Sequence, residues 1–132
     1  MKALDINALV RFLVKDDPAQ AEIIYRKLKQ AETDGEVFFV PLLVVLELIW
    51  VLDSVYKIPR QEIVDSLESL LRMPILRYES QSVIQGLISS ARDTRIGLPD
   101  LLIAQSAKHS GCETVLTFDQ RVRQFGFFSR LQ

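Results

Sequence analysis

The chain has little of the side-chain chemistry from which thiol and imidazole sites are built. Among its 132 residues it has one cysteine, Cys112, and one histidine, His109. A single cysteine excludes an intrachain disulfide and a zinc site made of thiolates. A single histidine likewise excludes a metal site built from several imidazoles. The common disulfide and zinc frameworks are therefore ruled out.

Glycine and proline are also scarce, with five of each, and they mark the ends of elements rather than a linker. Asp5 falls where the apolar region of a signal peptide would begin. The most apolar stretch, residues 37–52, is interrupted by Glu47 and makes a poor membrane span. The sequence therefore predicts a single domain over residues 1–132, in a cytoplasmic protein with no membrane contact.

An excess of either charge is missing as well. The 16 basic and 17 acidic side chains give a formal net charge of −1, so the chain as a whole does not attract nucleic acid. Hydrophobic residues make up 48% of the chain and charged residues 25%, which is typical of a soluble, packed domain. Any binding of nucleic acid must then depend on a local site.

Short apolar runs alternate with helical patterns along the chain. The pattern predicts strands at 2–5, 36–40, 74–78, 114–118 and 127–128, and helices at 7–14, 18–33, 42–56, 60–71, 81–91 and 100–110. Such alternation is typical of an α/β fold with a central, mainly parallel sheet and helices on both faces. Ligands of such sheets gather at the carboxyl ends of the strands.

Two aspartates follow predicted strands. Asp5 comes at the end of the first strand, and Asp119 at the end of the fourth. If both strands belong to one parallel sheet, the two carboxylates lie at the same edge. Asp5 could also serve only to make the turn into the helix that follows.

Two further acids stand in unusual places on helices. The neighbours of Glu47 three and four residues away are all apolar, so we expect Glu47 on a packed face, where a carboxylate is costly unless it is paired or binds a metal. The alternatives are a buried ion pair or a side chain that reaches the surface. Asp100 follows Pro99 at a helix start, where it could simply stabilise the helix.

Together the four acids suggest one convergent pocket. Two unit charges 4 Å apart repel by about 1 kcal/mol in water and about 4 kcal/mol near a protein surface. Divalent cations remove that cost, and oxygen ligands select Mg²⁺ or Mn²⁺, which complete their shells with water and phosphate oxygens. The chemistry expected of such a site is attack on phosphorus by a metal-activated water.

The ordered acids resemble those of the PIN domain family. The resemblance rests on Asp5-Ile6-Asn7, on Glu47 inside an apolar helix, on Pro99-Asp100 and on Thr117-Phe118-Asp119. The run VPLLVVLELIWVLDSVYKIPRQEI is similar in particular to VapC-type toxins of bacterial toxin–antitoxin pairs. The resemblance covers about residues 1 to 125.

The resemblance implies an endoribonuclease that depends on Mg²⁺ or Mn²⁺ and cuts cellular RNA. It implies that the catalytic acids and metal ligands are Asp5, Glu47, Asp100 and Asp119, with Asn7 and Thr117 supporting the first and last of them by hydrogen bonds. It also implies a homodimer and inhibition by a small antitoxin whose tail crosses the active-site groove. Two positions depart from the family pattern: Ile6 replaces a hydroxyl residue, and Gly97 stands where many members have another acid.

Basic side chains near these acids are candidates for contacts with RNA phosphates. Arg11 and Lys15 follow Asp5 on the next helix, and Arg121 follows Asp119; Arg92, Arg95 and Arg123 are further candidates. The alternative for each is a solvated charged face.

Other functions fit less well. A phosphorelay receiver domain needs adjacent acids after the first strand and a late lysine, and an aspartyl phosphatase needs Asp-x-Asp, whereas this chain has Asp5-Ile6-Asn7. A PIN-like binding module with little or no catalytic activity remains the alternative function.

Overall fold

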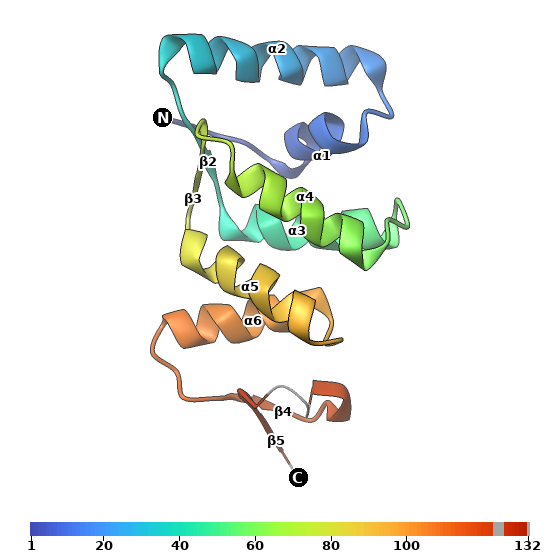
Figure 1. Ribbon diagram of the computed structural model, residues 1–132, viewed down its shortest axis with the longest axis vertical. Coiled ribbons are helices and arrows are strands. Elements are labelled where there is room, and N and C mark those ends of the chain that lie inside the picture. Colours follow the sequence, from blue (N-terminus) through green and yellow to red (C-terminus); the bar gives the residue numbers. More distant parts are fainter. Residues whose placement is uncertain (123–125, 132) are drawn as a thin grey trace. The chain divides into compact units, whose positions relative to one another are not determined.

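The structure is a computed structural model that describes residues 1–122 and 126–131. The chain divides into two compact units, Met1–Glu79 and Ser80–Gln132. Short parallel strands alternate with helices along the chain, as Figure 1 shows by its colours, which confirms the predicted α/β class.

The first unit is built on a three-stranded parallel sheet. Its strands are β1 (Lys2–Ala3), β2 (Phe38–Val40) and β3 (Leu76–Tyr78), with β2 in the centre. Phe38 and Val40 are buried because the central strand is covered on the faces they occupy. Val40 lies opposite Tyr78 in the register, so the carboxyl ends of these strands meet at one edge.

Four helices complete the first unit, and their ends follow from local sequence signals. They are α1 (Ile6–Val14), α2 (Pro18–Asp34), α3 (Leu42–Ser54) and α4 (Arg60–Leu71). Asp17 caps α2 by accepting a hydrogen bond from the amide of Gln20 at 3.1 Å, and Gly35 ends it in the left-handed conformation at φ 68°. The predicted helix ends are confirmed to within a few residues.

The sequence of α3 is apolar nearly all round, but only one of its faces is buried. One face of α3 is buried, and it consists of Val45, Leu48, Ile49 and Leu52. On the other face Leu43 is 72% exposed and Trp50 is 59% exposed. The rest of the chain covers one side of this helix, so its sequence is more apolar than its burial within one chain requires.

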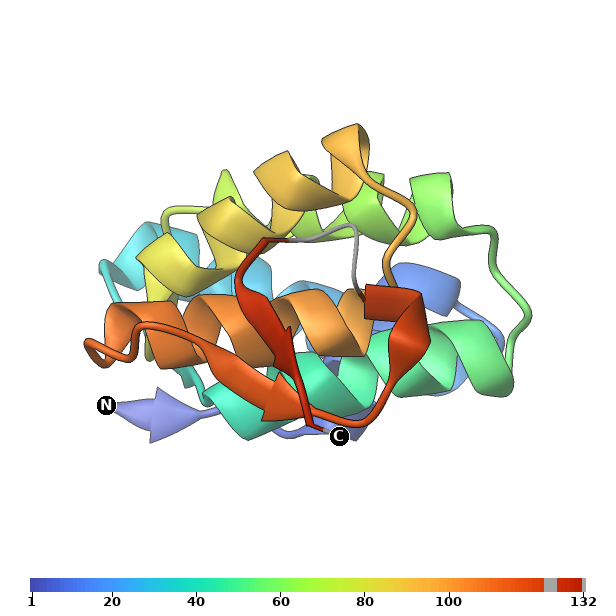
Figure 2. The same ribbon diagram turned by 90° about the horizontal axis from the view of Figure 1, so that it is seen from below.

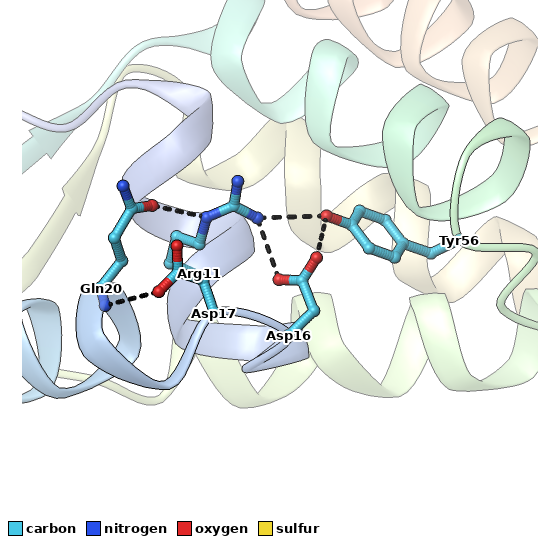
Figure 3. Close-up of polar contacts among 5 residues, drawn as sticks. All are labelled: Arg11, Asp16, Asp17, Gln20 and Tyr56. Atoms are coloured by element: carbon cyan, nitrogen blue, oxygen red, sulfur yellow. Dashed lines mark hydrogen bonds and ion pairs between the residues drawn. The ribbon is translucent and has the colours of Figure 1, made fainter.

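A polar network centred on Arg11 joins three parts of the first unit. As Figure 3 shows, the guanidinium of Arg11 in α1 donates to Gln20 Oε1 at 2.7 Å, to Asp16 Oδ1 at 2.9 Å and to the Tyr56 hydroxyl at 3.2 Å. The Tyr56 hydroxyl in turn donates to Asp16 Oδ2 at 2.8 Å. The network therefore ties α1 to the start of α2 and to the segment after α3.

The second unit contains α5 (Gln81–Asp93), α6 (Leu98–His109), β4 (Val115–Thr117), a 3-10 turn (Gln120–Val122) and β5 (Phe128–Arg130). Figure 2 shows α5 and α6 side by side. Gly86 lets the two helices approach closely, because a side chain there would collide with that of Gln105. The predicted helices and strands of this unit are confirmed, each to within a few residues.

The strands of the described residues form two sheets, not one. β4 pairs with β5, in parallel, and not with β1, β2 or β3. The expectation that Asp5 and Asp119 end strands of the same sheet is therefore wrong as it was argued. The strands are so short that apolar periodicity alone could not assign their partners. Among the described residues, no helix combines the length and apolar character needed to cross a bilayer.

Candidate active site

Asp5 is positioned by the turn from β1 into α1. Its backbone is extended, and its Oδ1 accepts a hydrogen bond from the amide of Ala8 at 3.2 Å, so Asp5 is the N-cap of α1. The residue is exposed, and the cap occupies only one of its two carboxylate oxygens. Asn7 is exposed in the first turn of the same helix. The proposed support of Asp5 by Asn7 stays a prediction.

Glu47 does not lie on a packed face, and that expectation from the sequence is corrected. It is exposed on α3, on the same side as Leu43 and Trp50. The reason is that α3 turns its opposite face to the core. The side chain of Glu47 therefore reaches the surface, which is one of the two alternatives to a metal ligand on a packed face. Because α3 packs against α1, Glu47 and Asp5 belong to neighbouring elements of the first unit.

Glu79 is a residue that the sequence analysis missed. It follows β3 directly. Its Oε1 accepts a hydrogen bond at 3.1 Å from the amide of Leu42, which is the first residue of α3. Pro41 precedes this helix and has no side chain that could cap it, so the carboxylate of Glu79 supplies the missing acceptor. The signal that could have identified Glu79 is its place directly after a predicted strand, which it shares with Asp5. Glu79 fixes the start of the helix that carries Glu47.

In the second unit, Asp119 forms an ion pair with Arg121. Asp100 lies in the first turn of α6, and Asp119 follows β4. The guanidinium of Arg121 donates from Nε to Asp119 Oδ1 at 3.0 Å and from Nη2 to Oδ2 at 2.7 Å. The hydrogen bonds to Asp119, and then its charge, raise the pKa of Arg121, and the charge of Asp100 contributes less.

Thr117 supports the backbone of Asp119. Its Oγ1 accepts a hydrogen bond from the amide of Asp119 at 3.0 Å, which fixes the turn after β4. The carboxylate of Asp119 in turn accepts from the amide of Arg121 at 2.8 Å. The hydrogen bond that Thr117 accepts therefore orients the turn that carries Asp119. It does not involve the carboxylate of Asp119.

The ion pair sets the acidity of Asp119. The hydrogen bonds from the side chain and then the backbone of Arg121 lower the pKa of Asp119 from 3.8 to about 2. Because the folded-state pKa lies below the unfolded one, the pair stabilises the fold above about pH 4, and this contribution is lost as the pH falls toward 2.

We expect Arg121→Gln to return the pKa of Asp119 toward 3.8. Carboxyl NMR titration measures it, and an unchanged pKa in the variant would contradict the assigned cause.

Gly97, one of the positions that depart from the family pattern, lies close to the carboxylate of Asp100. Its backbone is at φ −54°, which any residue can adopt, so conformation does not require glycine here. A Cβ at this position would lie 3.2 Å from Asp100 Oδ2. The carboxylate of Asp100 therefore leans over Gly97, and a side chain there would push it by a few tenths of an ångström.

The basic residues near the acids differ in how they are used. Arg11 is committed to the network with Asp16 and Tyr56, whereas Lys15 is exposed and ends α1 in the left-handed conformation at φ 61°. Arg92 and Arg95 are exposed in the second unit, and Arg123 lies outside the described residues. Contacts of these side chains with RNA stay predictions.

A groove opens between α1 and α2, one turn beyond Asp5. It has a volume of about 700 Å³. Its walls combine apolar side chains, among them Ala8, Ile23 and Ile24, with amide and basic groups of Asn7, Arg11, Gln20, Arg26, Lys27 and Gln30. Ile23 is 69% exposed, so the apolar wall is open to solvent. The groove suits an amphipathic partner better than a small polar molecule.

The described side chains do not form a ready-made metal site. Among residues 1–122 and 126–131, no three or more histidine, cysteine, aspartate or glutamate side chains lie together in a way that would hold a metal ion. Magnesium is often held by one or two carboxylates, with substrate phosphates completing its shell. At Asp119 the positive charge is supplied by the guanidinium of Arg121.

Comparison with known proteins gives these positions a family context. A family model described as "PIN domain" matches residues 2–128, a range that contains all four candidate acids. The chain is also 29% identical over 127 residues to a protein of Aquifex aeolicus (strain VF5) described as "VapC ribonuclease", with 96% of this chain and 93% of the relative covered. With nearly its whole length matched by one family model, the chain belongs to the PIN domain family.

Proposed function

We propose that this chain is a metal-dependent endoribonuclease of the VapC type that hydrolyses phosphodiester bonds of RNA. The observation that carries the proposal is the family match over residues 2–128 together with the relative described as a ribonuclease. That match runs through both compact units, which also favours one functional domain over residues 1–132. The ordered acids supply the oxygen ligands that such chemistry requires.

The proposed ligands of a Mg²⁺ or Mn²⁺ ion are Asp5, Glu47, Asp100 and Asp119. The chemistry of the donors fits a hard divalent ion, because all four are carboxylates. The ion pair of Arg121 with Asp119 supports a demand for positive charge at that acid. When bound, such an ion supplies a more acidic water and positive charge for the leaving oxygen.

The chain's own residues would prepare the site. The N-cap role of Asp5 holds its carboxylate at the start of α1, and the bond from Glu79 holds the helix that presents Glu47. The amide of Arg121 fixes the carboxylate of Asp119, while Thr117 fixes the turn beneath it. Asp5 and Asp119 are thus oriented by hydrogen bonds and Asp100 lies at a helix start before any ligand binds, which lowers the cost of assembling the site.

The direct test is cleavage of total RNA by the purified full chain. We expect cleavage with Mn²⁺ or Mg²⁺, none with excess EDTA, and recovery when the metal is added back, because the carboxylates alone do not activate water. Binding of RNA without cleavage under any metal condition would favour the alternative, a PIN-like binding module. Cleavage that EDTA leaves unchanged would contradict the proposed mechanism.

A cognate antitoxin is the partner that we propose for the groove between α1 and α2. The groove begins at Asn7 and Ala8, close in sequence to Asp5, so an occupant would pass near that acid. Its apolar wall and its basic side chains, Arg26 and Lys27, are complementary to an amphipathic segment that carries acidic residues. This arrangement would couple partner binding to the active site.

We also propose a homodimer. Val55, just after α3, is 58% exposed, and Ile103 on α6 is 50% exposed. Exposed large apolar side chains are typical of a surface that a second chain covers. The side of α3 that carries Leu43 and Trp50 also carries Glu47, so the interface has to leave that side open.

A further inference from the structure

The guanidinium of Arg121 covers the carboxylate that the proposed function assigns to a metal. Nε lies 3.0 Å from Asp119 Oδ1 and 3.2 Å from Oδ2, and Nη2 lies 2.7 Å from Oδ2. Both oxygens of Asp119 are therefore engaged by one planar cation. The amide of Arg121 also donates to Oδ1 at 2.8 Å, so the carboxylate is held from two directions by a single residue.

A metal ion bound to Asp119 would need the oxygens that Arg121 occupies. The guanidinium already donates to both Oδ1 and Oδ2. A divalent ion and a guanidinium close to one carboxylate would also repel each other strongly. The two cations therefore exclude each other at Asp119.

The side chain of Arg121 can move away from Asp119 at little cost. Its side chain is 88% exposed, whereas that of Asp119 is only 26% exposed, so the arginine can swing into solvent without losing packing while the acid stays in place. The hydrogen bond that the amide of Asp119 donates to Thr117 Oγ1 and the one that Asp119 accepts from the amide of Arg121 do not involve the guanidinium, so Asp119 keeps its orientation when that side chain moves.

We propose that Arg121 is an internal counter-ion that competes with the divalent metal for Asp119 and swings away when the metal binds. This inference rests on the proposed function, because it takes Asp119 as a metal ligand. The competition lowers metal affinity, and it keeps the charge of Asp119 neutralised while no metal is present. Exposed ion pairs are weak, so the pair is expected to lower the affinity by a factor of roughly two to five.

The test is titration of the folded, full-length protein with Mn²⁺, with free Mn²⁺ followed by electron paramagnetic resonance. We expect Arg121→Gln to bind Mn²⁺ about two- to fivefold more tightly than the wild type, with a smaller gain at high salt because salt screens exposed charges. Arg121→Lys should fall between them, since lysine keeps the charge but loses the bidentate geometry.

Lys108→Gln is the matched control for charge. Lys108 is exposed near the other end of α6, eight residues or about 12 Å along the helix from Asp100, and its loss changes the net charge equally. It should leave Mn²⁺ affinity nearly unchanged. Circular dichroism confirms that each variant is folded.

The outcomes separate the two proposals. If the wild type binds Mn²⁺ and Arg121→Gln gains no more than Lys108→Gln, the competition is refuted while the metal site stands. Weaker binding by Arg121→Gln would likewise overturn it, since the arginine would then help to hold Asp119 for the metal. If neither the wild type nor Arg121→Gln binds Mn²⁺, both proposals fail.

Discussion

Asp5→Asn is expected to reduce RNA cleavage by more than about 100-fold, because loss of a metal ligand should cost more than the roughly 10–100-fold loss typical of an outer-shell partner. The substitution separates two roles of this residue. Asparagine caps a helix about as well as aspartate does, so the hydrogen bond from Ala8 and the start of α1 are retained. Only the negative charge and the metal-binding oxygen are lost.

Asp17→Asn is the matched control for this experiment. Asp17 caps α2 just as Asp5 caps α1, accepting from the amide of Gln20 at 3.1 Å, but it has no place among the proposed ligands. We expect Asp17→Asn to cleave RNA at the rate of the wild type, with both variants unfolding at nearly the same temperature. Full cleavage by Asp5→Asn, or equal losses in both variants, would show that Asp5 acts only as a helix cap.

Leu48→Ala is expected to lower the free energy of unfolding by about 2–5 kcal/mol, because Leu48 is 0% exposed on the buried face of α3 and its truncation leaves a cavity. A loss of this size could unfold a domain of ordinary stability at room temperature. Urea denaturation followed by circular dichroism measures the change.

Leu43→Ala is the control on the same helix. Leu43 is 72% exposed and shares its side of α3 with Glu47, so its truncation in the monomer should change stability by no more than about 0.5 kcal/mol. If the Leu43 and Leu48 variants were equally destabilised in the monomer, α3 would be buried on both sides, and Glu47 would not be exposed.

The helices and strands could be predicted from the sequence because their signals are local. Asp17-Pro18 and Gly35 mark the two ends of α2 through capping and a left-handed turn, and both act within a few residues. Asp5 and Asp100 were found in the same way, since an acid at a helix start has a local physical reason.

What could not be predicted depends on partners that are distant in sequence. The apolar pattern of α3 does not say which face turns to the core, so the exposure of Glu47 was missed. Strand pairing of β4 with β5 involves residues more than ten positions apart, and apolar runs of three residues carry no pairing information. Similarly, the cap that Glu79 provides for α3 joins residues 37 positions apart.

The central claim is that Asp5, Glu47, Asp100 and Asp119 together bind a divalent ion. The most direct test is the affinity for Mn²⁺ of the variants Asp5→Asn, Glu47→Gln, Asp100→Asn and Asp119→Asn, each measured by calorimetry on folded protein. The claim predicts that every variant binds Mn²⁺ at least about tenfold more weakly than the wild type. Wild-type affinity in any one of them would contradict it.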